Sequence, residues 1–145
     1  MKRFAIALIF VLSLALSGCG NSSSSNSTIN GNWTATLTGT QDLSFTVSLT
    51  QSGSAVSVTN LSFTTSQSCF DTGATATGSF TLAGNTGGVT TGTFGMTIQS
   101  ASSNSNGSNT LALTGTLTNN SITGNWTLNG TGLGCTGSGT FTMTD

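Results

Sequence analysis

After residue 28, apolar and polar residues alternate along the chain in short runs, and turn-forming residues separate the runs. In the first run, Trp33, Ala35 and Leu37 alternate with threonines. Alternation with a period of two is typical of a β-strand that has one buried and one solvent-facing side. Eight such runs occur, at about residues 33–37, 43–49, 56–63, 74–82, 94–98, 111–117, 122–128 and 132–143.

Short turns join most of these runs, and no segment after the first eighteen residues has a helical period. Strands joined in sequence by short turns form antiparallel sheets, so we predict an all-β meander. In the third run the apolar positions change parity between Val58 and Leu61, which predicts a β-bulge near Thr59 and Asn60. Residues 100–109 form a wholly polar loop, and we expect it to be the most mobile connection.

Eight sequential strands can form a β-sandwich or close into an up-and-down barrel. A sandwich has sheet edges, which natural proteins protect with lysine, proline or inward-pointing charges. The chain has no proline, and no lysine after Lys2, so we favour the edgeless barrel and keep the sandwich as the alternative. A transmembrane barrel would need two aromatic girdles and a threonine-faced solenoid one fixed repeat, and the sequence shows neither.

The first eighteen residues have the pattern of a secretory signal peptide. Lys2 and Arg3 precede an apolar run over residues 4–16, which is short for a membrane span. The run ends in Leu16-Ser17-Gly18-Cys19, which resembles the lipobox of bacterial lipoproteins. The resemblance implies cleavage before Cys19, a diacylglyceryl group on its thiol, and a further acyl chain such as palmitate on the new amine.

The lipobox resemblance divides the chain into three parts. They are a signal peptide over residues 1–18, a lipidated cysteine with a serine-rich flexible tether over 19–28, and an all-β domain over 29–145. The implied location is the bacterial cell envelope, because two or more acyl chains hold a protein durably at a membrane. Gly20 follows the cysteine, and in the family's sorting rule a residue other than aspartate there indicates the outer membrane, if the cell has one.

Ionisable residues almost disappear after the signal peptide. The remainder has no Lys, Arg, His, Glu or Tyr, and its only carboxylate side chains are Asp42, Asp71 and Asp145. Nucleic-acid binding draws its affinity from cations, and general acid–base or nucleophilic catalysis needs a base with a tuned pKa. Transition-metal sites need imidazole, thiolate or clustered carboxylate ligands. We therefore expect no enzyme and no nucleic-acid binding, and we assign no catalytic residue, metal site or cofactor.

Two near-identical segments each contain a tryptophan: Thr28–Thr34 with Trp33, and Ser121–Thr127 with Trp126. Both indoles either plug the core or line a cavity in which they stack on an apolar or sugar-like ligand. Gly31-Asn32-Trp33 is similar to the Gly-x-Trp motif that opens the lipocalin and avidin-like barrels. That resemblance implies an eight-stranded meander with a small-molecule cavity, although the lipocalin Thr-Asp-Tyr motif and the arginine that packs on the tryptophan have no counterpart.

The remaining cysteines form an even pair. With Cys19 assigned to the lipid, Cys69 and Cys135 lie in an exported, oxidising setting, and we predict a disulfide between the loop before the fourth strand and the last strand. Two hypotheses for the activity stay open. One is a binding module that holds a small neutral ligand against Trp33 and Trp126. The other is a structural or surface protein that meets envelope components and has no ligand.

Overall fold

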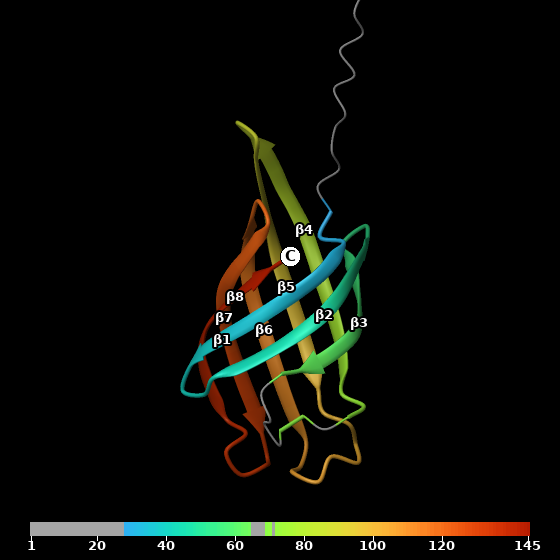
Figure 1. Ribbon diagram of the computed structural model, residues 1–145, viewed down its shortest axis with the longest axis vertical. Coiled ribbons are helices and arrows are strands. Elements are labelled where there is room, and N and C mark those ends of the chain that lie inside the picture. Colours follow the sequence, from blue (N-terminus) through green and yellow to red (C-terminus); the bar gives the residue numbers. More distant parts are fainter. Residues whose placement is uncertain (1–27, 65–68, 71) are drawn as a thin grey trace, which may run out of the picture.

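The computed structural model describes residues 28–64, 69–70 and 72–145, which form an all-β domain (Figure 1). The signal peptide, Cys19 with the tether up to residue 27, and Asp71 lie outside the described residues. Eight strands follow one another: β1 (Gly31–Gly39), β2 (Leu43–Ser52), β3 (Ala55–Phe63), β4 (Thr75–Thr86), β5 (Val89–Gln99), β6 (Asn109–Thr118), β7 (Ser121–Gly130) and β8 (Gly137–Thr144). Within the described residues, no helix has the length and hydrophobicity needed to cross a membrane.

The sheet closes on itself. Each strand pairs antiparallel with the next one in sequence, and β8 pairs with β1 from Thr34↔Thr144 to Gly39↔Gly139. The structure therefore confirms the eight-stranded meander and the up-and-down barrel, and it excludes the sandwich. Closure satisfies the strand edges that a chain without proline or further lysine has no other means of protecting.

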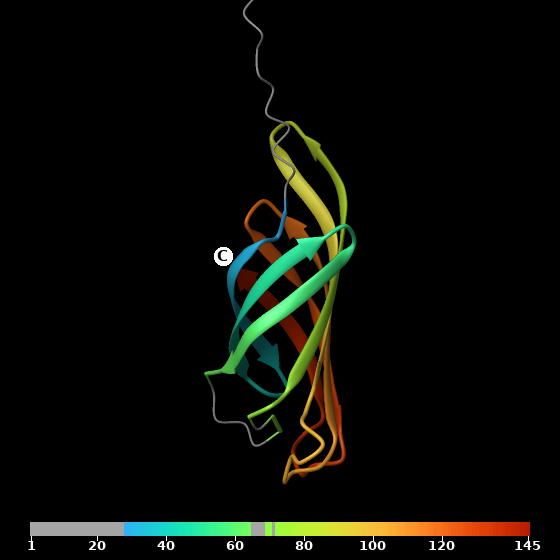
Figure 2. The same cartoon turned by 90° about the vertical axis from the view of Figure 1, so that its right-hand side faces the viewer.

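The two ends of the barrel differ in character (Figures 1 and 2). The described chain starts and β8 finishes at one end, which also carries the tight turns β2–β3, β4–β5 and β6–β7; we call it the turn end. The opposite end carries the four connections β1–β2, β3–β4, β5–β6 and β7–β8, and we call it the loop end. Three of these four connections are much longer than any connection at the turn end.

Alternate side chains of the strands, together with Ile29 just before β1, fill the barrel interior, although β3 and β4 each contribute only one buried side chain. The largest fully buried ones are Trp126, Phe45, Phe80, Ile29, Leu37, Leu43, Leu49, Ile98, Leu111, Leu113, Ile122 and Leu128. Inward-facing glycines make room for the aromatic rings: a Cβ on Gly115 would lie 2.9 Å from Phe141 Cζ, and one on Gly137 would lie 3.2 Å from Trp126 Cη2. Small and large residues therefore alternate across facing positions, which packs the interior densely.

The predicted bulge in the third run is confirmed. Asn60 has a φ of 54°, and the register between β2 and β3 shifts between Thr46 and Ser48 of β2. Asparagine tolerates this left-handed conformation better than most residues. β3 leaves β4 just before the bulge, because the described pairing of these two strands covers only Ala55–Ser57. This gap opens toward the loop end, and we call it the seam.

The hairpin of β4 and β5 is longer than the sequence pattern predicts. The glycine-rich stretch after Leu82 reads as a turn, but the ladder continues past a bulge to the pair Thr86↔Val89. Only Gly87 and Gly88 form the turn, with φ angles of 62° and 82°. Two positive φ angles in a two-residue loop match the twist of the flanking strands, and glycine adopts them without steric cost. The hairpin projects beyond the other turns (Figures 1 and 2).

Candidate functional site

The two tryptophans are the first candidates. Trp33 is 3% exposed and Trp126 is 1% exposed. Trp33 Nε1 donates to the carbonyl oxygen of Ile29 at 3.0 Å, and Trp126 Nε1 donates to that of Thr38 at 3.1 Å. Each indole thus has its body in the core and its one polar atom satisfied by the main chain, as buried tryptophans generally do.

The barrel does not bring the two indoles to one place. Trp33 is near the turn end of β1, whereas Trp126 is level with Gly139, which pairs with Gly39 at the loop end of β1. Five hollows in the described part of the chain, with volumes of about 200–380 Å³, are lined by other residues. This arrangement favours the core-plug interpretation. A ligand role for the two indoles stays a prediction.

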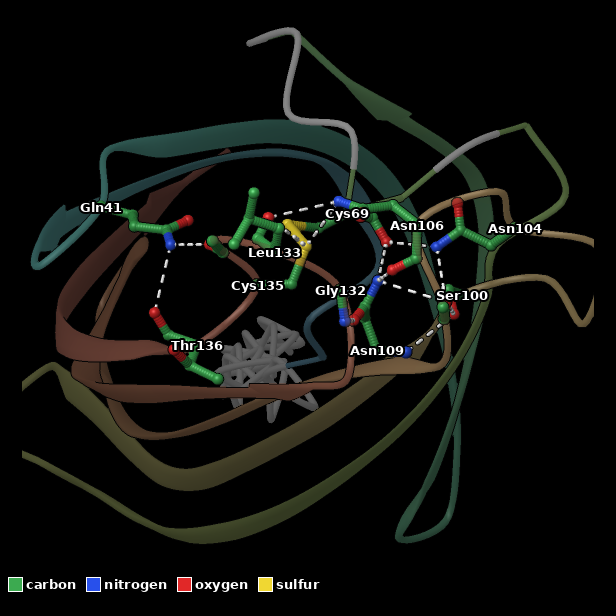
Figure 3. The surroundings of a disulfide bond; sticks show 12 residues. Gln41, Cys69, Ser100, Asn104, Asn106, Asn109, Gly132, Leu133, Cys135 and Thr136 are labelled. Atoms are coloured by element: carbon green, nitrogen blue, oxygen red, sulfur yellow. Dashed lines mark hydrogen bonds between the residues drawn. A yellow bond between two sulfur atoms is a disulfide. The ribbon is translucent and has the colours of Figure 1, made fainter.

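The disulfide between Cys69 and Cys135 is confirmed (Figure 3). Its sulfur atoms are 2.10 Å apart, and both residues are almost completely buried at the loop end. Cys135 lies in the β7–β8 connection just before β8, and not within the last strand as the alternation suggests. The bond therefore joins the β3–β4 connection, which lies beside the seam, to the β7–β8 connection.

Asparagine side chains surround the disulfide (Figure 3). Asn109 is 2% exposed and donates from Nδ2 to the carbonyl oxygen of Cys69 at 2.8 Å. Asn104 donates to the same oxygen at 3.0 Å. Asn109 Oδ1 accepts the backbone N–H of Gly132 at 3.4 Å, and Asn106 Nδ2 donates to the carbonyl oxygen of Leu133 at 3.4 Å. One polar network thus links three of the four loop-end connections.

Gln41 links the fourth connection, between β1 and β2, to the β7–β8 connection (Figure 3). Its Nε2 donates to the carbonyl oxygens of Gly134 and Thr136, the latter at 3.1 Å. The sequence analysis identified neither Gln41 nor the asparagines. Amide side chains that hydrogen-bond backbone groups of nearby loops have no periodic signature, and only the frequency of asparagine in residues 100–109 hinted at this role.

The seam contains a hollow of about 200 Å³, lined by Leu61, Ser62, Phe63, Phe70, Thr72, Gly73 and Ala74. The rings of Phe63 and Phe70 stack with their centroids 4.8 Å apart, and Phe45 meets Phe63 from inside the barrel at 5.4 Å. Aromatic packing therefore takes the place of the missing β3–β4 ladder. Phe70 is only 6% exposed, so most of this apolar surface is already covered.

The outer face of the barrel is a regular array of hydroxyl groups. Cross-strand partners form one continuous row over seven strands, which runs Thr81, Thr93, Thr116, Thr123, Thr142, Thr36 and Ser44. Side chains directly opposite each other on neighbouring strands are in contact distance, so each row presents adjacent hydroxyl and methyl groups. Besides the disulfide cysteines, the described residues contain only two ionisable side chains, Asp42 and Asp145.

Within the described residues, no group of three or more His, Cys, Asp or Glu side chains could hold a metal ion. Comparisons of the chain with protein-family models, with curated proteins and with solved structures found no match. Assignment of a function consequently rests on the geometry of the barrel and on the sequence signals at its start.

Proposed function

We propose that the protein is a lipid-anchored structural or surface component of a bacterial cell envelope. The packed interior is the observation that carries this proposal. The largest side chains of the domain fill the barrel, and both indoles are committed to main-chain hydrogen bonds. A carrier of small molecules needs a concave, partly empty pocket, and cavities of this kind usually have several hundred Å³ and a few convergent polar groups. The outer surface of the barrel is then the part that makes contact with other envelope components.

The arrangement of the two ends supports tethering at a membrane. The described chain begins at Thr28 on the turn end, so a lipid on Cys19 holds this end toward the bilayer. The loop end then faces away from the bilayer, with its connections joined by the disulfide and the asparagine network. Disulfides form and persist in oxidising compartments, so the Cys69–Cys135 bond also supports export.

The uncharged exterior supports a passive surface role. Rows of threonine hydroxyls and methyls offer many weak hydrogen bonds and no Coulombic attraction for charged ligands. Such a surface suits lateral contact with neutral envelope components such as glycans. The membrane is reached through the lipid, and we propose neither a nucleic-acid partner, a catalytic activity nor a cofactor.

Titration of tryptophan fluorescence distinguishes a coat protein from a ligand carrier. We expect no change in emission when fatty acids, retinoid-like molecules or neutral oligosaccharides are added, because Trp33 and Trp126 are sealed in the core. Saturable quenching by one class, lost in a Trp126→Phe variant that remains folded, would replace the structural proposal with the ligand-binding one.

The lipid anchor is tested separately. Mass spectrometry of the amino-terminal peptide from membrane fractions is expected to show cleavage before Cys19 and the added acyl mass. A Cys19→Ala variant is expected to lose both the acyl mass and the membrane association. An unprocessed amino terminus on protein recovered from the cytosol would contradict the proposal.

A further inference from the structure

The β4–β5 hairpin stands beside the point where the described chain begins. Thr28 lines one hollow of about 380 Å³ together with Gly88 and Thr90 of the hairpin and with the β6–β7 turn. The hairpin tip projects further from the barrel than this starting point does (Figures 1 and 2). Cys19 lies nine positions before Thr28, and a chain of that length spans at most about 30 Å. The hairpin is therefore within reach of a bilayer that holds Cys19.

The hairpin also exposes apolar side chains. Among the described residues the exposed large hydrophobic side chains are Leu82, Val89 and Leu133. Val89 is 39% exposed and belongs to the projecting part of the hairpin. Leu82 is 44% exposed and lies at the root of the hairpin, where its partner Gly92 still pairs with β6. Leu133 is at the opposite end of the barrel, in the β7–β8 connection. Two of the three therefore lie on the hairpin at the end that faces the proposed anchor, whereas the most exposed one, Leu133 at 94%, lies at the other end.

The chemistry of the hairpin fits the polar–apolar boundary of a bilayer. Residues 82–90 contain no charged side chain, so entry into the headgroup region desolvates no ion. The pairs Gly84↔Thr91, Asn85↔Thr90 and Thr86↔Val89 satisfy the backbone within the hairpin. Paired backbone groups can enter an environment poor in water without the cost that an open edge would have.

The root of the hairpin is fixed, whereas its outer part lacks sheet neighbours. Thr90 N–H donates to Asn119 Oδ1 at 3.3 Å, and Asn119 N–H donates to the carbonyl oxygen of Thr90 at 2.9 Å. In the described part of the chain, β3 pairs with β4 only as far as Ser79, and β6 pairs with β5 only as far as Thr91. A two-stranded ribbon alone is only marginally stable in water, so this projection gains from a further contact.

We propose that the β4–β5 hairpin, through Leu82 and Val89, is a second contact with the lipid bilayer that orients the anchored barrel. This inference rests on the proposed lipid anchor at Cys19. With the acyl chains as the only attachment, the barrel could rotate about its tether. With the hairpin at the interface as well, the loop end is directed away from the membrane.

The experiment places a reporter in the hairpin of the full, processed and lipidated chain. Leu82→Trp and, independently, Val89→Trp are reconstituted in phosphatidylethanolamine–phosphatidylglycerol vesicles with and without bromine on the acyl chains. Leu133→Trp is the matched control, since it replaces an exposed leucine at the opposite end. The emission of the parent protein is subtracted, because Trp33 and Trp126 are present in every variant. Near-UV circular dichroism checks that each variant is folded.

We expect blue-shifted emission that brominated lipids quench for the two hairpin variants, and no quenching for Leu133→Trp. Lipidated protein that floats with the vesicles but shows no hairpin quenching overturns this inference and leaves the anchor intact. The same result is expected if the hairpin contacts an envelope protein instead of the bilayer. Chain that carries no lipid at Cys19, as shown by mass spectrometry, overturns the proposed function, and the inference falls with it.

Discussion

Trp126 donates a hydrogen bond from its indole Nε1 to the carbonyl oxygen of Thr38, across 88 positions of the sequence. The indole starts on β7 and reaches β1, and β8 lies between these two strands. It can do so because β8 has glycine at the inward-facing positions 137 and 139: a Cβ on Gly137 would press against the ring, and one on Gly139 would collide with the accepting oxygen of Thr38. One side chain thus bridges the three strands at which the barrel closes.

Replacement of Trp126 by phenylalanine is expected to lower the free energy of unfolding by about 2–3 kcal/mol, because the substitution leaves a cavity and removes the indole hydrogen bond. Urea unfolding followed by far-UV circular dichroism measures this change. Trp33→Phe is the matched control, because the indole of Trp33 bonds to Ile29, only four positions away in the sequence, and does not bridge distant strands. An equal or larger loss for Trp33→Phe would contradict a special role of Trp126 in barrel closure.

Reduction of the Cys69–Cys135 disulfide is expected to lower stability by about 4 kcal/mol. The two cysteines are 66 positions apart, and in the chain-entropy account a closed loop of this length restricts the unfolded state by about that amount. Urea unfolding with and without a reductant measures the difference. The double variant Cys69→Ser with Cys135→Ser should match the reduced protein and should no longer respond to the reductant. A variant as stable as the oxidised parent would refute the prediction.

Much of this fold could be predicted from local signals. Strict alternation fixes which side chains of each strand face inward, and the parity change between Val58 and Leu61 marked the bulge at Asn60. Barrel closure followed from the lack of edge-protecting residues. The disulfide followed from an even number of remaining cysteines in an exported domain.

Other features depend on contacts between distant segments and had no local signal. The glycines of residues 84–88 read as a turn, yet Gly84 lies within the ladder, because glycine in a strand and glycine in a turn look alike in sequence. Asn104 and Asn109 occur in a polar loop, and only the position of the Cys69 carbonyl oxygen explains their burial. The seam arises because the pairing of β3 with β4 stops after Ser57, which no run of residues shows by itself.

Gly92 of β5 lies beneath the ring of Phe80. A Cβ there would be 2.5 Å from Phe80 Cε2 and 2.9 Å from the carbonyl oxygen of Thr81. Gly92→Ala is therefore expected to lower the free energy of unfolding by about 1–3 kcal/mol, through overpacking. Thermal and urea unfolding measure the change, and Phe80→Leu in the same chain should recover part of it.

Gly84 is the matched control for Gly92 because it lies on the partner strand of the same hairpin. A Cβ at Gly84 would meet no atom within 4 Å. Gly84→Ala is expected to change stability by less than about 0.5 kcal/mol, or to raise it slightly by restricting the unfolded chain. Similar losses for the two alanine variants would show that steric conflict with Phe80 is not the cause.

Asn109 tests whether the loop end is held by its polar network. Asn109→Ala removes a donor to the Cys69 carbonyl oxygen and the acceptor of the Gly132 N–H, in a place only 2% exposed. Buried groups left without partners cost about 1–3 kcal/mol, so we expect a loss in that range and faster hydrogen exchange at the Gly132 amide. Asn125→Ala on the outer face of β7 should change stability by less than about 0.5 kcal/mol. Equal effects of the two substitutions would mean that the hydrogen bonds of Asn109 do not hold the β7–β8 connection in place.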